Sequence, residues 1–252
     1  FYKECKPSLY RDKHMNEFDV FVEKIKIAEF ELMIRDMPIV KYFNDEHYII
    51  DYLGLAQHYG LKTDVLDFTS DLDIALFFAM CDYDKTKNCY TQKTIDKEYI
   101  GYLYATSLFV YSDPENIKLK PIGLQPFKRP GRQKGFALHM TKDENLSAYL
   151  YSFSYTKKDS ELYYKKYMEN NYLLADDDIV DRTTLINNSK YFTTKAISLA
   201  RRKYGNNHSS NWWIKQLKIN GFKMVNYKKL LWNDKKYKTN INITNADKLE
   251  IE

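Results

Sequence analysis

The stretch "LAQHYGLKTDVLDFTSDLDIALFFAM", residues 55–80, joins a half crowded with polar residues to an ordinary apolar half. In the second half, Ile74, Ala75, Phe77 and Phe78 recur at helical spacing. Hydrogen-bonding and turn residues fill the first half: Gln57, His58, Tyr59, Gly60, Thr63, Asp64, Asp67 and Thr69. The pattern predicts a helix end, a tight turn, a short strand and a second helix.

These element ends bring polar groups together. Gly60 suits the left-handed position after a helix, which puts Gln57 and His58 in the last helical turn. Residues 65–68 are branched and apolar and predict a buried strand, followed by N-caps at residues 69–71. Asp67 alternates with its apolar neighbours, and a helix N-terminus nearby favours anions. Asp67 and Thr69 either contact a ligand or only pin the turn.

The rest of the chain predicts an α+β fold with no internal repeat. Residues 15–36 form an amphipathic helix that Pro38 ends, and a second helix is capped by Asn44 or Asp45 and has an apolar stripe that reaches Ala56. A polar loop covers residues 82–97. Further strands are expected at 99–106, 135–140 and 146–155, and further helices at 193–204 and 210–220. We expect a helical N-terminal part packed on a small, mostly antiparallel sheet, with a helical C-terminal part.

Composition favours a cytoplasmic protein without a metal. The three cysteines have no paired spacing, and the five histidines have no zinc spacing. No apolar run reaches the length of a membrane span, so no membrane partner is expected. Residues 176–178 are three consecutive aspartates, which either bind a metal or form a solvated loop; the missing ligand spacing favours the loop.

Positive charge is concentrated late in the sequence. The net charge is +5, yet residues 195–238 carry twelve Lys or Arg and one acid. This region either approaches nucleic acid, with Arg201, Arg202 and Lys203 as candidate contacts, or is a solvated surface. Residues 212–213 are two tryptophans that could stack on bases. Helical spacing with Leu217 favours the core for the second of them.

The polar stretch resembles the hallmark of the FRG domain, roughly L-x-Q-H-x-G-x-P-T-R-L-L-D-W-T-x₅-A-L-x-F-A. Residues 6–11, "KPSLYR", resemble its P-S-L-x-R element, and residues 132–136, "RQKGF", resemble a later element. The resemblance covers about residues 1–155, which we expect to form an FRG-like domain, with 156–252 as a helical basic part of the same globular unit. The F-R-G tripeptide is absent, and its expected place lies just before Phe1. Lys62 replaces the usual Pro, and Asp64 the usual Arg.

The resemblance implies, by a coarser analogy, an ADP-ribosyltransferase-like fold that uses NAD as its substrate. On that analogy the missing tripeptide gives the first element, residues 67–69 the second and Gln133 the third. Asp67, Gln133 and His58 are the catalytic candidates, and His58 is equally well explained as a structural residue at a helix end. The candidate NAD contacts are Gln57, Tyr59, Thr63, Thr69 and Arg132.

Two functions from different classes follow. The first is an NAD-consuming enzyme that transfers ADP-ribose to nucleic acid or protein, or hydrolyses NAD. Its expected setting is a bacterial toxin or anti-phage defence effector, with an antitoxin or another defence protein as partner. The second is a non-catalytic module that recognises a nucleotide or nucleic acid. We expect the polar motifs around Gln57, Asp67 and Gln133 to converge on one pocket.

Overall fold

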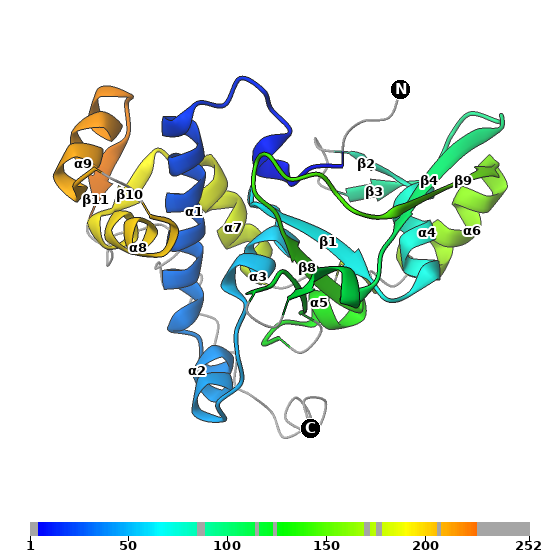
Figure 1. Cartoon of the computed structure of the whole chain (residues 1–252), viewed down its shortest axis with the longest axis horizontal. Helices are drawn as coiled ribbons and strands as arrows, with labels where there is room; N and C mark the ends of the chain where they lie inside the picture. The colour runs from blue at the N-terminus through cyan, green and yellow to red at the C-terminus, as the bar shows by residue number, and fades with distance from the viewer. Residues whose placement is uncertain are drawn as a thin grey trace. The chain divides into compact units, whose positions relative to one another are not determined.

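The computed structural model describes residues 5–84, 89–113, 116–122, 125–168, 172–174, 178–205 and 208–225. These residues form helices and short, mostly antiparallel strand pairs, which confirms the predicted α+β fold. The chain divides into two compact units (Figure 1). Unit 1 comprises Phe1–Lys6 and Leu66–Asp176, and unit 2 comprises Pro7–Val65 and Asp177–Glu252. None of the helices in the described ranges is both long and apolar enough to span a bilayer.

Unit 2 is mainly helical. In chain order its elements are η1 Ser8–Tyr10, α1 Glu17–Arg35, α2 Pro38–Asp45, α3 Tyr52–His58, α7 Asp178–Asn188, β10 Tyr191–Thr193, α8 Thr194–Tyr204, α9 Ser210–Ile219 and β11 Lys223–Val225. The short strands β10 and β11 pair in parallel, with Phe192 opposite Met224. Helix α1 lies beside α8 (Figure 1).

A capping box sets the start of α1. The Asn16 side chain accepts from the Asp19 N–H at 3.0 Å, and the Asp19 carboxylate accepts from the Asn16 N–H at 3.1 Å. Two otherwise unsatisfied N–H groups of the first turn are thereby paired. The apolar stripe of the helix then packs into the core of unit 2, as the sequence spacing predicts. That stripe includes Phe21, Val22, Ile25, Ala28 and Leu32.

Trp213 is the centre of this core. It is fully buried, and its ring stacks on Phe21 with centroids 4.0 Å apart. Leu217, one turn further along α9, is also buried. The core interpretation of these two residues is therefore confirmed. The side chains of Ser209 and Thr193 cap α9 and α8.

The segment between α1 and the polar stretch differs from the prediction. Pro38 does not only end the preceding helix; it is the first residue of α2. Proline suits this position because the first helical N–H needs no partner within the helix. The following helix, α3, is capped by Asp51 rather than by Asn44 or Asp45. Its end is as predicted: His58 is its last residue, and Gly60 has a φ of +86°.

Unit 1 contains most of the strands. Its elements are β1 Val65–Thr69 (in this unit from Leu66 onward), α4 Leu72–Met80, β2 Asp82–Asp84, β3 Cys89–Thr91, β4 Tyr99–Ala105, η2 Leu108–Tyr111, β5 Ser112–Asp113, β6 Asn116–Ile117, β7 Leu119–Pro121, α5 Lys128–Arg132, β8 Gly135–His139, β9 Tyr149–Tyr155 and α6 Lys157–Met168. Strands β1, β8 and β7 form a three-stranded sheet with β8 in the middle. Antiparallel pairs join β7 to β8, β4 to β9, and β2 to β3.

The predicted strands β1, β4, β8 and β9 are confirmed, but the polar loop at residues 82–97 is partly wrong. It contains the antiparallel pair of β2 and β3, with Tyr83 opposite Tyr90. Helix α4 packs against α6, and the core between them includes Ile74, Phe77 and Tyr167. The predicted division into residues 1–155 and 156–252 does not follow the limits of the two units and stays a prediction.

Candidate functional site

The predicted site residues lie in both units, so each group is considered by itself. Unit 2 holds Gln57, His58, Tyr59 and Thr63, and unit 1 holds Asp67, Thr69, Arg132 and Gln133. The expected convergence of these groups on one pocket stays a prediction.

A hydrogen-bond cluster joins Ser8, Gln57 and Thr63 in unit 2. Thr63 Oγ1 donates to Gln57 Oε1 at 2.6 Å, and Ser8 Oγ lies 3.3 Å from the same oxygen. The Thr63 N–H donates in turn to Ser8 Oγ at 3.0 Å. The Ser8 element and the polar stretch, about fifty residues apart in sequence, are thus fastened together.

Thr63 is fully buried, so its polar atoms need partners inside the protein. Its hydroxyl also accepts from the Val65 N–H at 3.2 Å, and its carbonyl accepts from the Leu9 N–H at 3.0 Å. These contacts give Gln57 and Thr63 a structural role at the entry to β1. Their predicted contact with NAD remains untested.

His58 and Tyr59 follow Gln57 at the end of α3. Tyr59 is buried, and its ring lies 6.1 Å from that of Phe30, centroid to centroid. This packing favours a core role for Tyr59. His58 is half-buried, and its Nε2 atom is enclosed by the protein. Both the structural role and the catalytic role proposed for His58 fit this position.

The turn from β1 to α4 places Asp67 and Thr69 in unit 1. Asp67 is exposed between the buried Leu66 and the half-buried Phe68, as the alternation predicts. Thr69 Oγ1 accepts from the Asp71 N–H at 3.0 Å. Asp71, which sequence reasoning did not separate from Thr69 as the N-cap, accepts from the N–H groups of the first turn of α4. The turn is therefore built by Thr69 and Asp71, whereas Asp67 faces solvent.

Lys134 connects this turn to the "RQKGF" element. Its Nζ lies 2.7 Å from Asp71 Oδ2, and its carbonyl accepts from the Ser70 N–H at 3.3 Å. The hydrogen bond from Lys134 lowers the pKa of Asp71, and the same bond raises the pKa of Lys134. Lys134 also has a φ of +48°, a conformation uncommon outside glycine. Sequence reasoning gave no role to this lysine, and only its place between two candidates could have marked it.

Arg132 and Gln133 turn toward the segment after α6. Gln133 is buried, and its Nε2 donates to the Leu173 carbonyl at 2.9 Å. Arg132 donates to the Tyr172 carbonyl at 3.1 Å and stacks over the Tyr172 ring at 5.2 Å. Both side chains hold residues 172–173 in place. The roles of Gln133 in ribose binding and of Arg132 in NAD binding stay predictions.

A sequence model of the FRG domain family matches residues 2–88. Residues 2–88 belong to the FRG domain family. This match confirms the resemblance over residues 2–88, whereas its extension to residue 155, with the "RQKGF" element, stays a prediction. No curated protein matches the chain. No solved structure matches it either. The matched range contains both the Ser8 cluster and the turn at Asp67, and it runs across the boundary between the units at residue 65.

An aromatic group lies in the unit 1 part of the FRG domain and just beyond it. The rings of Tyr83 and Tyr90 lie 5.0 Å apart, and Tyr90 also contacts Phe78 at 5.4 Å. Burial raises the pKa of Tyr90, and the charges of Tyr83 and Asp67 raise it further. Burial also raises the pKa of Tyr83, and the positive charge of Arg129 lowers it. The charges of Asp67 and Arg129 therefore act on this pair of tyrosines, which sequence reasoning missed because β2 and β3 were expected to be a loop.

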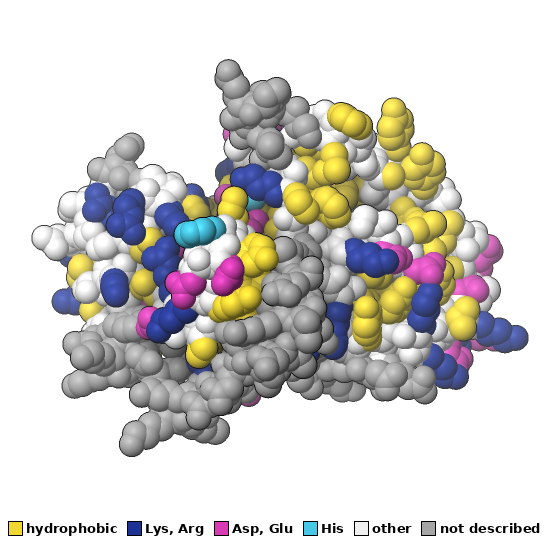
Figure 2. All heavy atoms as spheres, turned by 90° about the horizontal axis from the view of Figure 1, so that it is seen from below, with side chains coloured by type: hydrophobic (Ala, Val, Ile, Leu, Met, Phe, Trp, Pro, Cys, Tyr) yellow, Lys and Arg dark blue, Asp and Glu magenta, His cyan; other side chains and the backbone are white. Residues whose placement is uncertain are grey.

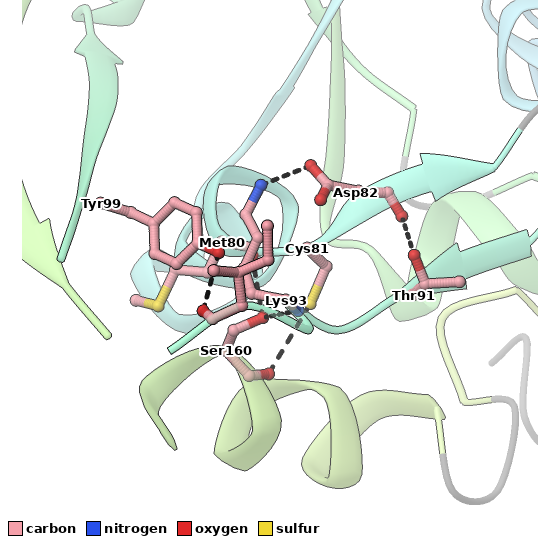
Figure 3. Close-up of polar contacts among 8 residues, drawn as sticks. Met80, Cys81, Asp82, Thr91, Lys93, Tyr99 and Ser160 are labelled. Atoms are coloured by element: carbon pink, nitrogen blue, oxygen red, sulfur yellow. Dashed lines mark hydrogen bonds and ion pairs between the residues drawn. The ribbon is translucent and has the colours of Figure 1, made fainter. Parts of the chain in front are cut away.

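Ser160 of α6 ties the end of the FRG domain to the rest of unit 1 (Figure 3). Its Oγ donates to the Met80 carbonyl at 2.9 Å and accepts from the Lys93 N–H at 3.0 Å. Cys81 beside it is buried, and burial raises the pKa of its thiol to about 11. A thiol that stays protonated is a poor nucleophile, and a fully buried serine is closed to substrate. This cluster is structural.

The basic candidates outside the FRG domain lie on α8 in unit 2. Lys203 Nζ forms an ion pair with the buried Glu31 at 2.6 Å. Arg201 donates to the His208 carbonyl at 2.7 Å and to Ser210 at 2.9 Å. Arg202 is exposed. Two of the three candidates therefore hold unit 2 together, and their role in nucleic-acid binding stays a prediction.

The acidic run at residues 176–178 lies largely outside the described residues. Asp176 and Asp177 are not described, and Asp178 is the first residue of α7. Elsewhere, within the described ranges, no three His, Cys, Asp or Glu side chains are grouped so that they could hold a metal ion.

Proposed function

We propose that the FRG domain binds NAD and cleaves its nicotinamide–ribose bond, passing ADP-ribose to nucleic acid, to protein or to water. The observation that carries the proposal is the exposed Asp67 carboxylate in unit 1, whose charge adds to the effect of burial in raising the pKa of Tyr90. Among the other polar residues of this stretch, Thr63 belongs to the hydrogen-bond cluster with Gln57. Thr69 forms the turn after β1, and Asp71 caps α4. The Asp67 side chain is exposed.

The chemistry needs a carboxylate of this kind. The bond between the nicotinamide nitrogen and ribose C1′ breaks, and its electron pair leaves with nicotinamide. An oxygen or nitrogen of the acceptor bonds to C1′, and its proton passes to solvent. The ribose carries positive charge in the transition state, which a fixed carboxylate stabilises. Asp67 would supply that charge, since the amide of Gln133 has none.

Other groups of unit 1 offer what a dinucleotide requires. An aromatic ring such as Tyr83, which is 45% exposed, stacks on a planar base or nicotinamide. A guanidinium such as that of Arg129, which acts on Tyr83, suits a phosphate oxygen. The Thr69 hydroxyl, which accepts from Asp71, retains a hydrogen that can be donated to the ligand.

The test is nicotinamide release by the full chain, with any upstream residues included. We expect Asp67→Asn to lower the rate at least about tenfold, or about 1.4 kcal/mol of transition-state stabilisation, while the melting temperature stays unchanged. Asp96→Asn, which removes an equally exposed carboxylate elsewhere in unit 1, is the matched control and should keep full activity. Loss of the fold in Asp67→Asn would make the residue structural and end the proposal.

The competing function is a non-catalytic recognition module. It becomes the better account if the wild-type protein binds nucleotide but releases no nicotinamide with any acceptor offered. The proposed setting, a bacterial toxin or defence effector held by a partner protein, is tested separately by expression in bacteria. Growth arrest that Asp67→Asn relieves and Asp96→Asn does not relieve would support it.

A further inference from the structure

Helices α8 and α9 lie in a stretch that carries only positive charge. Residues 190–225 contain eight Lys or Arg and no Asp or Glu. Figure 2 shows Lys and Arg side chains gathered over the end of the molecule that carries these helices. A surface without acids attracts a polyanion more strongly than a mixed surface of the same net charge.

Three of these cations contact other groups of unit 2. Lys203 is paired with Glu31, Arg201 holds the segment before α9, and Lys190 lies over the Phe222 ring at 4.6 Å. Besides Lys203, the exposed cations of the two helices are Lys195 and Arg202 on α8, and Lys215 and Lys218 on α9.

The exposed cations follow helical faces. Lys195 and Arg202 are seven residues apart on α8, so they lie on the same face, two turns apart. On α9, Lys215 and Ile219 follow Trp212 at three and seven residues and share its outward face. The opposite face of α9 carries the buried Trp213 and Leu217. Each helix therefore presents a stripe of its own to solvent.

Trp212 adds a flat aromatic surface to the stripe of α9. It is 38% exposed, and its ring stacks on His208 with centroids 3.8 Å apart and planes at 14°. It meets the buried Trp213 ring edge-on, at 4.9 Å and 87°. Held between these two rings, Trp212 is fixed before any ligand arrives, which lowers the entropic cost of stacking.

We propose that Lys195, Arg202, Trp212, Lys215 and Lys218 form a binding surface for single-stranded nucleic acid. The cations contact phosphates, and the exposed part of the Trp212 ring stacks on a base. Single-stranded nucleic acid is favoured over a lipid surface or an acidic protein because aromatic platforms between cations match its alternation of bases and phosphates. The proposal does not depend on NAD chemistry.

Acids of α1 limit the extent of this surface. Glu17 and Asp19 flank Phe18, whose ring lies 6.1 Å from that of Trp213, and the Asp19 carboxylate serves the capping box. Glu31 is paired with Lys203 and Arg35. We therefore exclude α1 from the binding surface.

The experiment measures the affinity of the full chain for a fluorescent twenty-residue oligo(dT), by anisotropy over a series of salt concentrations. A triple variant, Lys195→Ala, Arg202→Ala and Lys215→Ala, should bind more weakly and lose about 2 from the slope of log affinity against log salt, at ~0.7 per phosphate contact. Trp212→Ala should weaken binding about tenfold with little change of slope, and Trp212→Phe should recover part of the loss. The matched control removes three exposed lysines of unit 1: Lys97→Ala, Lys142→Ala and Lys158→Ala.

Three outcomes would overturn the proposal. Equal weakening by the control triple would show that only net charge matters. Unchanged affinity in Trp212→Ala, or equally tight binding of a duplex of the same length, would remove the stacked base. Binding to phosphatidylserine vesicles or to poly-glutamate, but not to oligo(dT), would replace the proposed ligand by another polyanion. Melting curves of each variant separate lost binding from lost folding.

Discussion

Replacement of Glu29 by Gln removes a carboxylate from the interior of unit 2. Glu29 on α1 is 1% exposed, and its Oε1 accepts from the Thr193 N–H at 2.5 Å. Its Oε2 is buried and has no hydrogen-bond partner among the described residues. Thr193 is the N-cap of α8, so Glu29 fastens α1 to the start of that helix. Gln keeps the shape and the acceptor oxygen but removes the charge.

The size of the effect follows from the pKa of Glu29. Burial raises this pKa from 4.5 to about 7, against the hydrogen bonds from Thr193, which lower it. The folded state therefore binds the proton more tightly than the unfolded state. This tighter proton binding stabilises the folded state fully below pH 4.5, and the stabilisation is lost as the pH rises to about 7. At about 1.4 kcal/mol per pH unit, the loss reaches about 3 kcal/mol.

Urea unfolding of the wild type and of Glu29→Gln at pH 5, 6, 7 and 8 measures this directly. We expect similar free energies of unfolding at pH 5, and an advantage for Glu29→Gln that grows to about 3 kcal/mol by pH 8. Glu98→Gln, which changes an exposed glutamate of unit 1, is the control and should follow the wild type at every pH.

Parallel curves for the wild type and Glu29→Gln would refute the reasoning. They would mean that the carboxylate titrates at the same pH in both states, so that it is not buried as described. A variant less stable than the wild type at pH 8 would show that the charged form is bound more favourably than burial allows. Other groups that titrate in this range cancel, because only the difference between the two proteins is compared.

Two further substitutions test the packing of the units. Thr63→Val removes the hydroxyl that joins Gln57 to the Val65 N–H and should cost about 1–3 kcal/mol in urea unfolding, whereas the same change at the exposed Thr94 should cost little. Gly101→Ala places a Cβ 2.3 Å from the Phe153 ring and should destabilise by about 1–3 kcal/mol. The double variant with Phe153→Ala should be more stable than the sum of the single losses implies; strict additivity would contradict the clash.

Local signals in the sequence predicted most of the helices and the long strands. Gly60 marked the end of α3, Ser209 marked the start of α9, and apolar spacing marked α1, because each depends on neighbours in sequence. Helix α2 was missed because a proline reads equally well as the end of one helix and the start of the next. Strands β2 and β3 were missed because their residues are polar and show no period. Their place depends instead on distant contacts such as that of Lys93 with Ser160.

The candidate site was predicted in part. Alternation along β1 predicted that Asp67 points away from the side of Leu66 and Phe68, and in the structure Asp67 is exposed. The partners of Gln57 could not be predicted, since Ser8 is 49 residues away in sequence and nothing local points to it. The same holds for Gln133, because its amide donates to the carbonyl of Leu173, 40 residues later in the sequence. A polar residue in a motif is equally suited to a ligand and to a buried partner, and only the fold decides between them.

The departure at residue 64 bears on where a phosphate could bind. Asp64 stands where the FRG pattern has Arg. In unit 2, burial raises the pKa of the half-buried Tyr204, and the charges of Glu31, Asp64 and Asp51 raise it further. Negative charge at this end of α3 opposes a phosphate there. In unit 1, by contrast, a single turn supplies three cations, Arg129, Arg132 and Lys134, the last of them paired with Asp71 beside β1. We therefore propose that this turn, and not the hallmark position that carries arginine in the family, would bind the pyrophosphate of NAD.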